Sequence, residues 1–133
     1  MMITNQPNGG KKDNKIVGNG GELIACLFLE SKGYEIIEKN YRAYRKEIDI
    51  IAKKDGYLVF AEVKTRRTTN FGAPSESVNY KKQRHILWAA KKYLADHLRL
   101  YSKFQPRFDV IEVYCDQKTK KNYVRHIEGA FIE

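Results

Sequence analysis

The chain has 133 residues, of which 42% are hydrophobic and 31% charged, and 25 Lys and Arg against 16 Asp and Glu give a net charge of +9. This length fits one domain with its own core, and the positive charge favours a polyanion, nucleic acid ahead of an anionic membrane surface. No apolar run is long enough to cross a membrane, and residues 1–21 lack the apolar stretch of a secretory signal. We therefore expect a cytoplasmic protein, with Cys26 and Cys115 as reduced core residues.

The N-terminal part of the chain changes character near residue 20. Residues 1–19 are poor in apolar side chains and predict a flexible tail, which leaves 20–133 as a single domain. A helix is predicted over residues 22–31, a segment that is apolar nearly all round, with Gly33 ending it.

Three strands are predicted next, over residues 34–42, 47–52 and 57–64. Asp55 and Gly56 separate the last two and are typical of a two-residue hairpin turn. The three strands are therefore expected to form an antiparallel meander.

A long helix follows, capped by Ser75 or Ser77 and reaching about Leu100. Its apolar residues recur at helical spacing and predict the face that packs on the sheet. Two further strands are predicted over residues 107–114 and 123–127, the first reached by a crossover through the long helix. The expected fold is α/β, with a mixed central sheet flanked by helices.

The hairpin turn predicts which side chains face each other across two strands. A two-residue loop pairs Asp49 with Glu62 and Glu47 with Lys64, and alternation places all four on one face, whereas a three-residue loop would break this arrangement. The other face is then apolar, with Ile48, Ile50, Ala52, Val59, Ala61 and Val63.

Two carboxylates opposed across strands lie about 5 Å apart and repel each other. Asp49 and Glu62 therefore predict a site for a hard divalent cation such as Mg²⁺. Lys64 points to the same place, where an ammonium group would hold an attacking water or neutralise charge on a phosphate. A surface network of ion pairs is the alternative interpretation.

Glu22 shares a helical stripe with Cys26 and Leu29, which directs it inward. The alternative is a first-turn acid that favours the helix dipole. Asp109, in an otherwise apolar strand, is expected to be a buried structural acid paired with an arginine or a helix end.

These motifs together resemble the PD-(D/E)xK nuclease superfamily, which includes restriction endonucleases and archaeal Holliday junction resolvases. The nearer resemblance is to the bacterial YraN-like family, small proteins of that predicted fold and poorly defined function. The matching segments are residues 21–22, 40–42, 47–52, 59–66, 77–82 and 107–110. Ile48 stands where the superfamily's name has proline.

The resemblance implies a restriction-endonuclease-like core of order αβββαβ and a DNA phosphodiesterase that requires Mg²⁺ or Mn²⁺. By that resemblance Asp49 and Glu62 would hold the metal, and Glu22 would support it from the helix. Lys64 would serve the water or the transition state. Branched or flapped DNA is the substrate considered, and a homodimer would fit enzymes of this fold that cut two strands.

Basic residues flank the proposed site in the sequence and are expected to contact phosphate. They are Arg42, Arg45, Lys46, Arg66, Arg67 and Lys82. Tyr44 lies among them and would stack on an unpaired base, whereas Tyr41 is assigned to the core. The alternatives to a nuclease are a nucleic-acid-binding module that keeps the fold without turnover and, after it, a protein-interaction scaffold in DNA metabolism.

Overall fold

The computed structural model describes residues 2–4, 13–68 and 78–132, and the side chains of residues 20–67 and 78–132. Its elements are β1 (Met2–Thr4), α1 (Asp13–Ser31), β2 (Glu35–Ala43), β3 (Lys46–Lys54), β4 (Tyr57–Thr68), α2 (Tyr80–Asp96), α3 (Leu98–Tyr101), β5 (Gln105–Asp116) and β6 (Lys121–Phe131).

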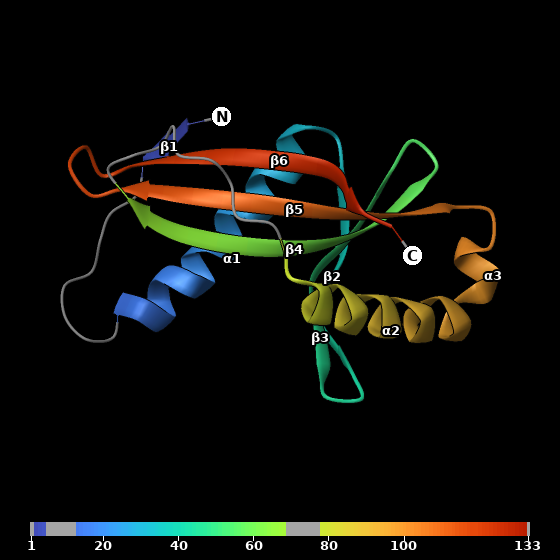
Figure 1. The fold of residues 1–133 in the computed structure, drawn as a ribbon. Coiled ribbons are helices and arrows are strands. Elements are labelled where there is room, and N and C mark those ends of the chain that lie inside the picture. The colour runs from blue at the N-terminus through green and yellow to red at the C-terminus, as the bar shows by residue number, and fades with distance from the viewer. Residues whose placement is uncertain (1, 5–12, 69–77, 133) are drawn as a thin grey trace.

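The strands form one six-stranded sheet in the order β1-β6-β5-β4-β3-β2 (Figure 1). Neighbouring strands are antiparallel except β4 and β5, which are parallel and joined through α2. The order from α1 to β5 confirms the predicted α/β class and the αβββαβ core of a restriction-endonuclease-like fold. No helix in the described part of the chain has the length and apolar character to span a membrane.

Both faces of the sheet are apolar. One core cluster joins α1 to Ile50, Ala52, Val59 and Ala61, and a second joins α2 to Ile51, Leu58 and Phe60. Strands buried on both faces carry near-continuous apolar runs, as β3 and β4 do here. Cys26 and Cys115 are buried free thiols in the α1 cluster, as predicted.

The N-terminal segment departs from the predicted flexible tail over residues 1–19. Residues Met2–Thr4 form β1, which pairs with β6, and α1 begins at Asp13 instead of residue 22. A short edge strand needs only backbone hydrogen bonds, so it leaves no hydrophobic pattern in the sequence. The glycines at 18, 20 and 21 lower intrinsic helix propensity, which the tertiary context overrides.

The boundaries of the long helix also differ from the prediction. Asn79 caps α2, because its Oδ1 accepts a hydrogen bond from the Lys82 N–H at 2.8 Å. The predicted caps, Ser75 and Ser77, lie outside the described residues. The helix ends at Asp96, and after His97 the short α3 continues to Tyr101.

The hairpin register is confirmed over the part nearest the turn. Asp55 and Gly56 both have positive φ, 51° and 82°, as a two-residue type I′ turn requires. The β3–β4 ladder runs from Lys54↔Tyr57 to Ile50↔Ala61 and ends there. The predicted direct pairings of Asp49 with Glu62 and of Glu47 with Lys64 were therefore wrong, because the two strands diverge just before these residues.

The predicted apolar face is confirmed for Ile50, Ala52, Val59, Ala61 and Val63, which pack in or against the α1 cluster, and is wrong for Ile48. Ile50 packs in the cluster with α1, whereas Ile48 packs in the cluster with α2, so the two do not share one side. On the neighbouring β2, Asn40 has a left-handed backbone with φ 54°, which interrupts the regular alternation of that strand. Tyr41 follows it and contacts Tyr93 of α2 edge-to-face, which confirms its core assignment.

Candidate functional site

The diverging strands open a place where three carboxylates meet. Glu22 on α1 and Glu47 and Asp49 on β3 each offer one carboxylate oxygen, and these oxygens lie within 4.8 Å of one another. All three residues are half-buried. Glu22 is not in the first turn of α1, which starts at Asp13, so the helix-dipole explanation of this acid does not apply.

Asp49 is fixed by the strand beside it. Its Oδ2 accepts a hydrogen bond from the Val63 N–H of β4 at 2.8 Å, beyond the last backbone pair of the ladder. A carboxylate thus occupies the position that a backbone carbonyl would fill in a continued ladder. Burial raises the pKa of Asp49, while this hydrogen bond and the charge of Lys82 act to lower it.

Asn40 links the two glutamates of the group. With its amide oriented to satisfy both neighbours, its nitrogen donates to Glu47 Oε1 and to Glu22 Oε2, each at 3.1 Å. Burial and the charge of Asp49 raise the pKa of Glu22, against the Asn40 hydrogen bond. Asn40 belongs to the segment 40–42 that carries the family resemblance, but no role was predicted for it. Its signal was an asparagine inside a predicted strand, since asparagine tolerates the left-handed backbone.

Glu62 lies beside this group without being part of it. On the α2 face of β4, its Oε1 is 3.6 Å from Lys82 Nζ. Its Oε2 is buried and has no hydrogen-bond partner among the described residues. Burial, followed by the charge of Asp49, raises the pKa of Glu62 to about 7, against the opposing charges of Lys82 and Lys64.

The predicted acids and lysine therefore gather in one region, although not by the predicted pairing. Glu22 and Asp49 share the three-oxygen group. The charge of Asp49 raises the pKa of Glu62, and the charge of Lys64 lowers it. Glu47, for which no role as a ligand was predicted, also belongs to the group. Raised pKa values of crowded carboxylates are common at functional sites, because burial and like charge both oppose ionisation.

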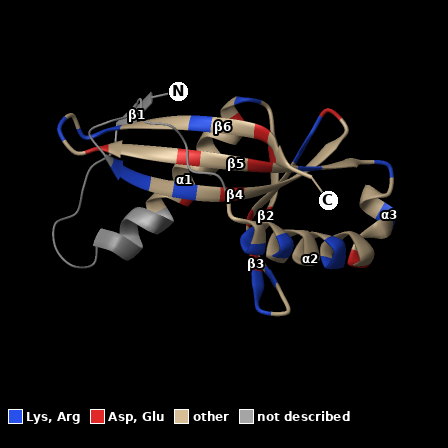
Figure 2. Cartoon of the chain, in the orientation of Figure 1, with Lys and Arg blue, Asp and Glu red and all other residues tan. Residues whose placement is uncertain are grey.

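The six predicted phosphate contacts are spread over β2, the β2–β3 turn, β4 and α2, and Figure 2 shows that Lys and Arg occur on several separate elements. Arg42 Nη2 is 3.1 Å from Glu47 Oε2, and Lys82 is tied to Glu62, so these two border the acids. Arg66 Nε is 3.7 Å from Glu112, which is fully buried, so its role includes neutralising that acid. Arg45 and Lys46 lie at the β2–β3 turn, and Arg67 is exposed near the end of β4.

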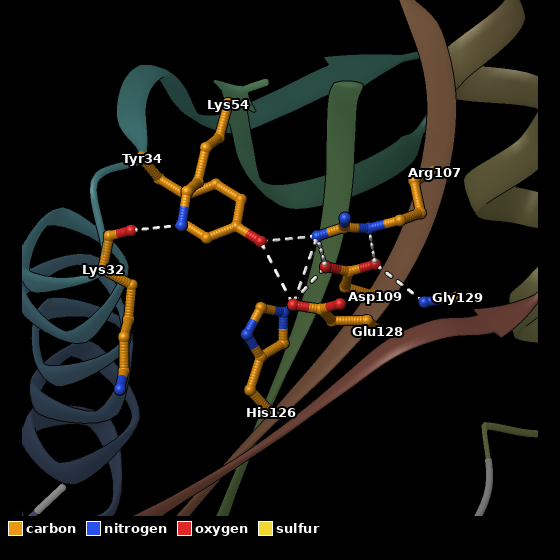
Figure 3. Close-up of polar contacts among 8 residues, drawn as sticks. All are labelled: Lys32, Tyr34, Lys54, Arg107, Asp109, His126, Glu128 and Gly129. Carbon is orange, nitrogen blue, oxygen red and sulfur yellow. Dashed lines mark hydrogen bonds and ion pairs between the residues drawn. The ribbon is translucent and has the colours of Figure 1, made fainter. Parts of the chain in front are cut away.

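Asp109 lies in a separate, closed network (Figure 3). It is fully buried and accepts hydrogen bonds from Arg107 at 2.9 and 2.8 Å, from His126 Nε2 at 2.7 Å and from the Gly129 N–H at 3.0 Å. Although burial acts to raise it, these hydrogen bonds hold the pKa of Asp109 below its usual value. The predicted pairing of this acid with an arginine is confirmed, and the hydrogen bonds from His126 and Gly129 connect β5 to β6.

Comparison with known proteins places the chain in a family. A model of the uncharacterised protein family UPF0102 matches residues 21–113. A UPF0102 protein of Caldicellulosiruptor bescii is 49% identical over 117 residues, which cover 88% of this chain and 98% of that protein. UPF0102 proteins of Caldanaerobacter subterraneus and Clostridium perfringens are 46% and 45% identical, each over 91% of this chain and 98% of their own length. In agreement with the YraN-like resemblance of its motifs, the chain belongs to the uncharacterised protein family UPF0102.

Proposed function

We propose that this protein is a nuclease that hydrolyses phosphodiester bonds in DNA with Mg²⁺ or Mn²⁺ as cofactor. One observation carries the proposal: three carboxylate oxygens from Glu22, Glu47 and Asp49 lie within 4.8 Å of one another. Glu62, with a buried Oε2 that has no hydrogen-bond partner among the described residues, stands beside them. The net charge of +9 suits a polyanionic substrate.

The donor set fits a hard divalent cation. Mg²⁺ and Mn²⁺ prefer carboxylate oxygens, and Mg²⁺ is commonly held by one or two carboxylates together with substrate phosphate. We assign Asp49 and Glu22 as ligands, with Glu47 added by the geometry and Glu62 as the adjacent carboxylate. When bound, the ion would supply positive charge to the phosphoryl group under attack.

The groups around the acids orient the carboxylates and balance their charge. The Val63 N–H holds Asp49 in one orientation, and Asn40 orients Glu22 and Glu47. Lys82 balances the charge of Glu62, while Lys64 is assigned to orient the attacking water or to stabilise negative charge in the transition state. Because the pKa of Glu62 is about 7, this group is partly protonated at neutral pH until a cation favours its ionised form.

A second candidate is a nucleic-acid-binding module without turnover. It is favoured by the cationic partners that two of the acids already have, Glu47 with Arg42 and Glu62 with Lys82. An ion-pair network of this kind would stabilise a binding surface without holding a metal.

A cleavage panel distinguishes the two candidates. The full chain is incubated with linear duplex, single-stranded, flapped and four-way-junction DNA in Mg²⁺, Mn²⁺ or EDTA. We expect cleavage that needs the metal and falls at least about 100-fold in Asp49→Asn, Glu62→Gln and Lys64→Met. Glu35→Gln, which changes an exposed acid paired with Lys53, is the matched control and should cleave as the unmodified protein does.

Two outcomes would reject the nuclease. One is the absence of cleavage on every substrate with either metal, and the other is cleavage that Asp49→Asn leaves unchanged, which would identify a contaminating enzyme. Binding of DNA that persists in EDTA and in Asp49→Asn, without any cleavage, would select the binding module.

A further inference from the structure

A groove lies outside the acidic site, between the exposed face of α2 and the turn that joins β2 to β3. Its volume is about 330 Å³, and it is lined by Tyr44, Arg84, Trp88, Lys91 and Lys92. Sites that hold one small molecule begin at about this size. The groove is therefore large enough for one planar ligand and too small for a folded partner.

The lining combines aromatic rings with positive charge. Trp88 is the only tryptophan of the chain and is 55% exposed, and Tyr44 across the groove is 64% exposed. Lys46 Nζ lies 6.0 Å from the centre of the Trp88 ring system. Exposed aromatic side chains that line one groove are typical of a ligand-binding site.

The charge of the groove is largely uncompensated. Of its lining cations, Lys92 pairs with Asp96 at 3.0 Å, and within the described residues neither Arg84 nor Lys91 has an acidic partner. Arg84 instead lies over the ring of Tyr80, 5.9 Å from its centre. The ligand that complements this surface carries both a flat π-face and negative charge.

The turn that presents Tyr44 is conformationally unfavourable. Tyr44 and Arg45 both have left-handed backbones, with φ 53° and 64°, in a turn type that favours Asn-Gly. Bulky residues rarely adopt this conformation, and strained backbone of this kind clusters at functional sites. This turn places the aromatic ring of Tyr44 at the edge of the groove, which a turn of Asn and Gly would not do.

We propose that this groove binds an unpaired base of single-stranded nucleic acid, stacked on Trp88, with the neighbouring phosphates on Lys46, Arg84 and Lys91. Stacking on aromatic rings inside a positively charged groove is how proteins hold single strands without reading their sequence. A base in a duplex cannot enter, since its faces are covered by its neighbours. The ligand class is therefore a single strand or a DNA structure with an unpaired segment.

Binding at the groove would select substrates for cleavage only if the protein is the proposed nuclease, so this part of the inference rests on the proposed function. Trp88 lies six residues after Lys82 on α2, which is about 9 Å along the helix axis. A single strand with its reacting phosphate beside Glu62 would extend along α2 to reach the groove. The groove would thus favour flapped or otherwise unpaired DNA over intact duplex.

Trp88 itself reports on occupancy. Its fluorescence is titrated in EDTA with a thymidine oligonucleotide, with a blunt duplex and with inorganic polyphosphate, which has the charge of a strand and no bases. We expect saturable quenching by the oligonucleotide and little change with the other two. Equal quenching by polyphosphate, or no quenching when fluorescence anisotropy shows the oligonucleotide to be bound, would overturn the proposal. Quenching by an acidic peptide as strong as that by the oligonucleotide would do so too.

Substitutions test the same point without relying on the reporter. Trp88→Leu should weaken binding of a labelled single strand at least about fivefold and leave duplex binding unchanged, whereas Trp88→Phe should restore part of the loss. Arg84→Ala and Lys91→Ala should weaken binding and reduce its salt dependence, with Arg99→Ala and Lys103→Ala as exposed controls outside the groove. Circular dichroism checks the fold of each variant. Single-strand binding by Trp88→Leu equal to that of the unmodified protein would reject the groove.

The two proposals fail separately. Binding is measured in EDTA, so a protein that binds single strands through Trp88 and cuts nothing would retain the groove and lose the nuclease. Metal-dependent cleavage that Trp88→Leu leaves unchanged on both flapped and duplex DNA would retain the nuclease and remove the groove.

Discussion

Gly21 of α1 and Thr65 of β4 lie so close together that a side-chain carbon at residue 21 would overlap Thr65 Oγ1. Only glycine allows the helix to approach the strand this closely. Glu22 is the next residue along α1 and belongs to the group of three carboxylates. The distance between Glu22 and Asp49 is therefore set in part by a residue that carries no side chain.

We predict that Gly21→Ala lowers the free energy of unfolding by about 1–3 kcal/mol and weakens binding of Mn²⁺, because α1 must move away from β4. Gly20→Ala is the matched control, since nothing lies within 4 Å of a carbon added at residue 20. That control should be neutral or stabilising by up to about 1 kcal/mol, because alanine favours the helix. Denaturant unfolding and isothermal titration with Mn²⁺ measure the two effects.

The close approach is further tested by a double-mutant cycle with Thr65→Ala. This second change removes the atom that the added carbon would meet, so it should cost less in the Gly21→Ala protein than in the unmodified one. Additive effects of the two substitutions would show that residue 21 does not press on Thr65.

The raised pKa of Glu62 predicts how stability depends on pH without a metal. The folded protein holds this proton with a pKa of about 7, against an ordinary value of 4.5. The free energy of unfolding should therefore fall as pH rises from about 4.5 to about 7, by up to about 3 kcal/mol, and then level off. The raised pKa values of Glu22 and Asp49 add to the same trend.

Glu62→Gln should accordingly make the protein more stable at pH 8 in EDTA, since a buried charge is replaced by a neutral group of the same shape. Melting curves from pH 4.5 to 8 measure this, with Glu35→Gln as the control for loss of an exposed acid. A Glu62→Gln protein that melts lower than the unmodified one at pH 8 would contradict an unfavourable carboxylate here. Asp109, with a lowered pKa, acts in another window, because its contribution is lost only at more acidic pH.

Mn²⁺ should reverse this loss of stability. At pH 8 it is expected to raise the melting temperature, because a ligand that binds only the folded state stabilises it. At pH 5 protons compete for the carboxylates and the effect should be smaller. Asp49→Asn, which can still accept the Val63 hydrogen bond, should remove the response, and an unchanged response in that variant would exclude Asp49 as a ligand.

The network around Asp109 is expected to stabilise the fold and to leave the acidic site unaffected. Asp109→Ala should lower the free energy of unfolding by about 3–5 kcal/mol, because it leaves the buried side of Arg107 and His126 without their acceptor. Glu128→Gln, at an acid whose side chain is 60% exposed and 3.9 Å from Arg107, should cost less than about 1 kcal/mol. Chemical denaturation compares the two, and similar costs would mean that burial of Asp109 adds nothing.

The hairpin register near Asp55 and Gly56 was predictable because turn chemistry and strand alternation are local. The end of the ladder at Ile50 was not, since it depends on a side-chain hydrogen bond from Val63 to Asp49 that no periodicity encodes. The divergence explains why the acids gather although they are not paired directly. The helical spacing of Glu22 with Cys26 and Leu29 was enough to predict that its side chain points inward. Asn40, which contacts Glu22 in space, has a left-handed backbone that its sequence does not specify uniquely.

Long-range partners explain the remaining differences. The cap at Asn79 and the cluster of Tyr44 with Trp88 bring together segments whose distance no spacing rule predicts. Arg66 was expected on phosphate, but a buried acid on β5, Glu112, attracts it. A sequence gives the sign of each charged residue, but which of these residues lie close enough to pair depends on the fold.

Asp49 has two roles, since it accepts the Val63 hydrogen bond at the end of the β3–β4 ladder and belongs to the group of three carboxylates. Selection acting on this residue therefore cannot separate the structural role from the role in the acidic site. A relative without the proposed nuclease activity would still need an acceptor for the Val63 N–H at this position. The buried Oε2 of Glu62, in contrast, accepts no hydrogen bond from the described residues, so it has no comparable structural role. Among related sequences, the residue aligned with Glu62 is therefore the better indicator of the proposed nuclease activity.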